Sequence, residues 1–213
     1  MGIPGHRFPT SLGGMPIRKL LAAGLFAASA LAVAAPATAA TAATTASEDA
    51  RDPARDVLSG PYFTDDLPTK AEPARRRGDI TRTTVTLGSD LVVTTRFRDL
   101  TPIGEQEFQW FIATSEDDFY WTADLTLLPG RDKGHFTLID PLANQPGCGQ
   151  AVLDRPGRTV TLTIPATCLG SPSWVRVGNG AIFFKSETQV FWDDARRDAG
   201  IRHGWKFGPK VTG

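Results

Sequence analysis

Carboxylates give this chain its clearest spacing for acid–base catalysis. Glu105 and Glu107 are separated by one residue, so in an extended strand both side chains lie on the same face. Glycoside hydrolysis needs two carboxylates about 5–10 Å apart across a cleft, and alternate strand positions can reach that spacing. The chain has no Gly-x-Ser-x-Gly nucleophile turn, so the histidines beyond its leader, His135 and His203, lack the context of an acyl-transfer site. A solvated acidic rim is the favoured interpretation, and no catalytic residue is predicted.

Aromatic side chains are the stronger functional signal. Flat rings stack on the apolar faces of sugars, and tryptophan adds a polar edge. Neighbouring residues of a strand face opposite sides, so an inward Trp110 and Trp121 would leave an exposed aromatic platform on the other side. The candidate ligand-binding residues are Gln109, Phe111, Tyr120, Trp192 and Trp205. The competing interpretation is that both strand faces are covered, one by the second sheet and one by the N-terminal arm, as the usual burial of large aromatic residues favours.

Paired aspartates offer another kind of chemistry, because Ca²⁺ prefers hard oxygen ligands. Asp193 and Asp194 follow Trp192 in an expected loop and form the best candidate pair. The chain has no EF-hand loop, and acidic turns between strands are common without a metal. The sequence therefore predicts no cofactor apart from the hypothesis of Ca²⁺ at Asp193 and Asp194.

Cys148 and Cys168 are the only two cysteines of the chain. A lone even pair in an exported protein predicts one disulfide bond. The bond would close a span of 20 residues and stabilise the fold by about 3 kcal/mol in the chain-entropy model. No neighbouring histidine supports a metal-binding or redox role for the pair.

The N-terminal region has the features of a secretion signal. Residues 15–19 give a short basic start, residues 20–33 form an apolar run, and residues 37–39 (Ala-Thr-Ala) offer a cleavage site. The run is too short and too rich in alanine for a membrane span. We expect a signal peptide over residues 1–39, with Met15 as the true start, and an extracellular protein with no membrane span after cleavage.

Composition then narrows the partners of the exported chain. Beyond residue 39 the chain has 20 basic and 23 acidic side chains, which gives no electrostatic attraction to nucleic acid or anionic lipid. Its one basic cluster, Arg75-Arg76-Arg77, is interpreted as part of a solvated linker. The length suits one domain, and we expect a monomer.

The elements that must position these residues are strands. From residue 79 onward apolar residues alternate with polar ones, and β-branched residues dominate. Asn179 lies between two glycines that could form a hairpin turn, but we favour one long strand over residues 174–184, bent there. Residues 165–169 are expected to form one helical turn. The pattern predicts an all-β, antiparallel sandwich with jelly-roll or immunoglobulin-like layering. The predicted parts are a signal peptide (1–39), a flexible or extended linker (40–78), the β-sandwich (79–195) and a C-terminal tail (196–213).

The order of these elements carries a resemblance. A Gly-Ser-Asp turn leads into residues 91–97 (Leu-Val-Val-Thr-Thr-Arg-Phe), and Cys168-Leu169-Gly170 later precedes residues 174–178 (Trp-Val-Arg-Val-Gly). Residues 79–195 thereby resemble secreted, uncharacterised bacterial sandwich domains, and are loosely similar to family 9 carbohydrate-binding modules and DOMON-type domains. The resemblance implies a β-sandwich that binds a sugar or, in DOMON domains, haem. No methionine follows Met15, so a Met/His pair of haem ligands is excluded.

The leading hypothesis is a secreted, non-enzymatic binding domain whose expected ligand is an extracellular polysaccharide. One alternative is a structural or protein-interaction domain of the cell envelope, with an envelope protein as its partner. The other is a small glycoside hydrolase that depends on a carboxylate pair. No nucleic-acid partner is expected.

Overall fold

The computed structural model describes residues 46–61, 68–102, 104–131, 133–186, 188–197 and 204–213. The chain divides into two compact units, Met1–Thr41 and Ala42–Gly213, and all described residues belong to the second. The predicted signal peptide and the predicted start at Met15 lie outside the described residues.

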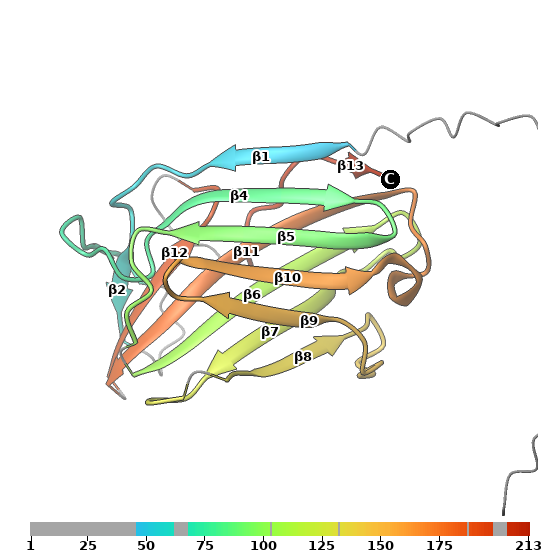
Figure 1. Cartoon of the computed structure of the whole chain (residues 1–213). Coiled ribbons are helices and arrows are strands. Elements are labelled where there is room, and N and C mark those ends of the chain that lie inside the picture. The colour runs from blue at the N-terminus through green and yellow to red at the C-terminus, as the bar shows by residue number, and fades with distance from the viewer. Residues whose placement is uncertain (1–45, 62–67, 103, 132, 187, 198–203) are drawn as a thin grey trace, which may run out of the picture. The chain divides into compact units, whose positions relative to one another are not determined.

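Two antiparallel sheets pack face to face in this unit, which confirms the predicted all-β sandwich (Figure 1). Sheet A has the strand order β1 (Ser47–Arg51), β4 (Ile80–Leu87), β5 (Asp90–Phe97), β10 (Thr159–Pro165) and β9 (Gln150–Asp154). Sheet B has the order β3 (Lys70–Ala71), β2 (Leu58–Gly60), β12 (Gln189–Asp194), β11 (Trp174–Ser186), β6 (Glu105–Thr114), β7 (Trp121–Leu127) and β8 (His135–Ile139). The short strand β13 (Val211–Thr212) also pairs with β11.

The core between the sheets follows the predicted alternation. Along β6 the side chains of Phe108, Trp110 and Ile112 are buried, whereas Gln109 and Phe111 lie on the outer face of sheet B. Period-two patterning therefore decides which aromatic rings build the core and which remain available outside it.

Strand β11 is one continuous strand, as predicted. Its register against β6 runs unbroken from Val175 to Phe184, so the Gly-Asn-Gly segment is not a hairpin. Asn179 points inward and donates hydrogen bonds to the hydroxyls of Thr83 and Thr95, which links sheet B to sheet A through a buried polar group. On the outer face, a Cβ at Gly180 would lie 2.5 Å from the ring of Trp205, so glycine there allows this ring to pack on the strand.

The described parts of residues 40–78, predicted as a flexible or extended linker, contribute strands to both sheets. We call residues 47–60 the N-terminal arm: β1 pairs with β4 in sheet A, and β2 pairs with β12 in sheet B. Val57 and Leu58 are buried where the arm crosses between the sheets. The arm is held largely by backbone hydrogen bonds, which leave little trace in a hydrophobic pattern.

The described part of the C-terminal segment, predicted as a tail over residues 196–213, packs on the sandwich. Trp205 is only 5% exposed, and Val211 is buried and paired with Val175. An ion pair of 2.8 Å between Arg196 and Glu48 links the start of the segment 196–213 to β1.

The disulfide bond Cys148–Cys168 is present, as predicted, with its Cα atoms 6.5 Å apart. It joins the loop before β9 to the 3-10 helix η1 (Ala166–Leu169), which is the predicted helical turn. Among the described residues, no helix has the length and apolar character needed to cross a membrane.

Candidate functional site

The five predicted platform residues gather on the outer face of sheet B. The rings of Phe111 and Tyr120 stack with centroids 4.8 Å apart, and those of Trp192 and Trp205 lie 5.9 Å apart. The indole N–H of Trp205 donates a 3.1 Å hydrogen bond to the side-chain oxygen of Gln109. The structure therefore brings these residues together, although they come from distant parts of the chain.

Most of this aromatic surface is used in packing. Trp205 forms a small second core with Ile182 and Val190. Tyr120 is 48% exposed and offers the most accessible ring of the five. The segment that covers the sheet here is the C-terminal one, whereas the sequence pointed to the N-terminal arm.

Glu105 and Glu107 both lie on the outer face of sheet B, as strand alternation requires, and Asp124 lies on the same face. Glu107 accepts a 2.6 Å hydrogen bond from the side-chain amide of Gln109, and Asp124 lies opposite Gln109 on β7. Burial and the nearby Glu107 raise the pKa of Asp124 to about 7. Asp124 therefore changes its protonation near neutral pH, a property that its sequence position did not indicate.

Asp193 and Asp194 lie on opposite faces of β12, so they do not converge on one metal ion. Asp194 accepts hydrogen bonds from the backbone N–H groups of Arg196 and Lys206 and forms a 3.2 Å ion pair with Arg197. Asp193 points toward sheet A and accepts a 2.6 Å hydrogen bond from the backbone N–H of Ile80. Strand alternation separates these neighbours, whose carboxylates therefore serve different parts of the fold.

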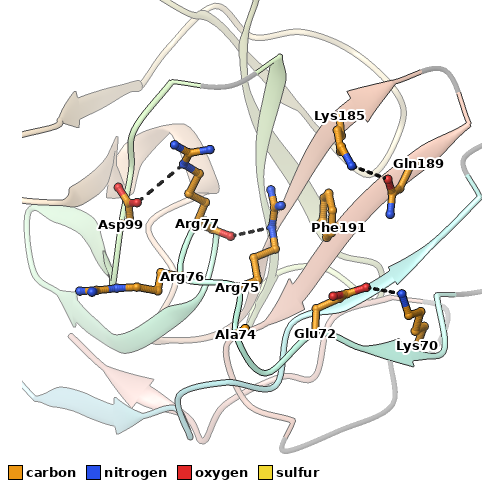
Figure 2. Close-up of a pocket in the computed structure, with 10 residues that line it drawn as sticks. All are labelled: Lys70, Glu72, Ala74, Arg75, Arg76, Arg77, Asp99, Lys185, Gln189 and Phe191. Atoms are coloured by element: carbon orange, nitrogen blue, oxygen red, sulfur yellow. Dashed lines mark hydrogen bonds and ion pairs between the residues drawn. The ribbon is translucent and has the colours of Figure 1, made fainter.

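An open pocket of about 630 Å³ lies beside the ends of β11 and β12 (Figure 2). We call it the basic pocket; it is lined by Lys70, Glu72, Ala74, Arg75, Arg76, Arg77, Asp99, Lys185, Gln189 and Phe191. A turn after β3, in which the N–H of Arg75 donates to the carbonyl of Glu72, brings the arginine run against β12. Arg77 and Asp99 form an isolated bridge that anchors the end of this turn.

Positive charge exceeds negative charge in the basic pocket. Two of its five basic residues form ion pairs, Lys70 with Glu72 at 3.0 Å and Arg77 with Asp99 at 3.7 Å. The other three have no ion pair with a carboxylate in the described part of the chain; they are Arg75, Arg76 and Lys185. The pocket can therefore accept an anion without first breaking an ion pair.

Arg75 is the best-positioned of these cations. Its guanidinium carbon lies 3.2 Å from the centroid of the Phe191 ring, and its Nε donates a 3.1 Å hydrogen bond to the carbonyl of Arg77 (Figure 2). Its Nη2 is buried and has no hydrogen-bond partner among the described residues. Burial and the neighbouring Arg77 lower the pKa of Arg75 to about 10. A guanidinium held in place at the wall of an open pocket is a suitable donor to a carboxylate, sulfate or phosphate group.

The basic surface continues beyond this pocket. A second hollow of about 420 Å³ shares Ala74 and Arg76 with the basic pocket and adds Arg55 and Arg98. Arg76 therefore lies between two adjoining hollows that both carry cations.

The sequence contained a signal for this site in Arg75-Arg76-Arg77, which we interpreted as a solvated linker. The arginine run forms a pocket together with Phe191 and Lys185, which lie more than 100 residues later in the sequence. Their proximity depends on the pairing of β2 with β12, and the arm was not expected to pair at all.

Comparison with known proteins adds no family. A scan of protein-family models gives no match to the chain, and searches of curated proteins and of solved structures give no significant match. The resemblance to family 9 carbohydrate-binding modules and DOMON-type domains stays a prediction.

Proposed function

We propose that this protein is a secreted, non-enzymatic binding domain, and that its basic pocket binds acidic groups of an extracellular polysaccharide. The observation that carries the proposal is Arg75, a half-buried residue of the pocket lining whose guanidinium lies over Phe191 and forms no ion pair with a carboxylate among the described residues. A carboxylate or sulfate group placed there would accept charge-assisted hydrogen bonds from a donor that is already oriented.

The second hollow favours a polymer over a small anion. The cations of the two hollows adjoin through Arg76, so acidic groups that repeat along a chain can each meet a cation. The basic pocket also falls within the size range of ligand sites, about 300–1,000 Å³. The chain as a whole has no positive charge excess, so we expect local recognition by the pocket rather than general attraction to polyanions.

Equilibrium binding to dextran sulfate and to polygalacturonate tests this function, with neutral dextran as the uncharged control. Arg75→Gln keeps much of the side chain but removes its charge, and we expect it to weaken binding about tenfold, as for loss of one charge-assisted hydrogen-bonded contact. Arg131→Gln makes the same change at an exposed arginine outside the pocket and should bind like wild type. Thermal melts establish that both variants are folded.

Equal binding by the two variants would overturn the role of Arg75. Failure of the wild-type chain to bind either acidic polymer would overturn the polysaccharide proposal, and a cross-linked envelope protein would then support the alternative of a protein-interaction domain.

A further inference from the structure

Three carboxylates converge inside the fold where the N-terminal arm crosses from sheet A to sheet B. Asp52 and Asp56 come from the loop between β1 and β2, and Asp193 comes from β12. One carboxylate oxygen from each lies within 4.8 Å of the other two. We call these three residues the acid cluster. None of them belongs to the basic pocket.

Among the described residues, Asp52 has no hydrogen-bond partner to account for its burial. It is only 6% exposed, and neither of its carboxylate oxygens has a hydrogen-bond partner among the described residues. Asp193 is 2% exposed and, in the part of the chain that the structure describes, accepts one hydrogen bond, from the backbone N–H of Ile80. Burying an unpaired carboxylate is costly, so such a group must be neutralised by a proton or by a cation.

Arg98 is already paired with another aspartate and does not neutralise the acid cluster. Arg98 forms its ion pair with Asp79, which also accepts the backbone N–H of Arg55. Within the described residues no ion pair joins Asp52 or Asp193 to a basic side chain.

The spacing matches a bound cation. Ca²⁺ takes six to eight oxygen ligands at about 2.3–2.6 Å, so two ligands on opposite sides of the ion lie about 4.6–5.2 Å apart. Three carboxylates supply up to six oxygens, and the set contains no sulfur or imidazole ligand that would favour Zn²⁺ or Cu²⁺. Mg²⁺ requires a smaller, near-octahedral arrangement and retains its waters, so a cluster of largely buried carboxylates suits it less well.

We propose that Asp52, Asp56 and Asp193 bind one Ca²⁺ ion, which fixes the N-terminal arm to β12. The ion joins the loop between β1 and β2 to β12, next to the short pairing of β2 with β12. This inference differs from the sequence hypothesis, because Asp194 is not a ligand and two residues of the arm are. It stands independently of the proposed function.

Calorimetric titration of the full chain with CaCl₂ after removal of metal with EDTA tests the site directly. We expect one ion per chain, with a dissociation constant of about 10⁻⁴–10⁻³ M, typical of extracellular modules. At ten times that concentration the melting temperature should rise by about 3–6 °C. MgCl₂ should give a smaller rise. Trypsin should cut more slowly after Arg51 and Arg55 when Ca²⁺ is bound. Arg51 precedes the loop that the ion holds, and Arg55 lies within that loop.

Asp52→Asn should abolish the Ca²⁺-dependent rise in melting temperature, whereas Asp118→Asn, the same change at an exposed aspartate, should retain it. Titration of the wild-type chain needs no variant, so misfolding of Asp52→Asn would not remove the test. Absence of Ca²⁺ binding by the wild-type chain, or an equal response from Asp52→Asn, would overturn the proposal and leave a proton-neutralised cluster.

Discussion

The acid cluster and the basic pocket lie along the same strand, β12, but treat charge in opposite ways. Asp193 and Phe191 are two residues apart and face the same side of the strand. Asp193 belongs to a buried set of like charges, whereas Phe191 supports Arg75 in a pocket open to solvent. Burial, more than the sign of the charge, therefore decides whether a region needs its ligand to neutralise charge.

The physical difference is the surrounding medium. Like charges in a low-dielectric interior repel strongly and must be neutralised before the fold is stable. Charges in an open pocket are screened by water and salt, so they cost the fold little and remain available to a partner. A ligand of the acid cluster should therefore change the free energy of unfolding. A ligand of the basic pocket should mainly fill the pocket and change that free energy little.

The largest expected effect comes from removing the Phe191 ring, which packs in the core and lies beneath Arg75. Phe191→Ala should lower the free energy of unfolding by about 3 kcal/mol, because a buried phenylalanine leaves a cavity. It should also weaken binding of acidic polymers, since Arg75 loses the ring beneath it. Urea denaturation measures the first effect. Phe119→Ala, at a ring that is 71% exposed, should change stability by less than about 0.5 kcal/mol and serves as the control. A loss below about 1 kcal/mol for Phe191→Ala would contradict its structural role.

A smaller effect, the change in unfolding free energy caused by Asp52→Asn, should have opposite signs without and with Ca²⁺. In EDTA, Asp52→Asn should raise the free energy of unfolding by about 1 kcal/mol, because it removes one of three converging carboxylates. In excess Ca²⁺ the same variant should be less stable than wild type, because the wild type gains binding energy that the variant lacks. Denaturant unfolding in both conditions measures this crossing. The same sign in both would show that charge repulsion does not govern the acid cluster.

Asp124 is a half-buried carboxylate, between the buried acid cluster and the open basic pocket. Its substitution should change stability least of the three. Its pKa is raised to about 7, so the stability that its protonated form contributes is complete below pH about 4 and is lost as the pH rises through about 7. Asp124→Asn stays neutral throughout. It should match wild type near pH 4 and exceed it by about 1 kcal/mol near pH 8, after allowance for partial exposure. Unfolding measured across this range tests the effect, and parallel curves for the two proteins would exclude it.

The sequence predicted the strands of the sandwich because their apolar residues alternate from Ile80 onward, and it predicted the disulfide because Cys148 and Cys168 have no competitors. It did not predict the arm, since Ser47–Arg51 pairs through its backbone and shows no apolar stripe. The functional regions were harder to predict from the sequence than the arm. Asp193 and Asp194 are adjacent in the chain but face opposite ways, and the true neighbours of Asp193 come from the arm. Only the fold could show which charges meet.

Binding of dextran sulfate to the wild-type chain and to Arg75→Gln, measured at low and at high salt, tests the central claim most directly. We predict tight binding by the wild type at low salt and about tenfold weaker binding by Arg75→Gln. This difference should disappear at high salt, because salt screens the charges of the open pocket. Indistinguishable binding curves for the two proteins at low salt would contradict it.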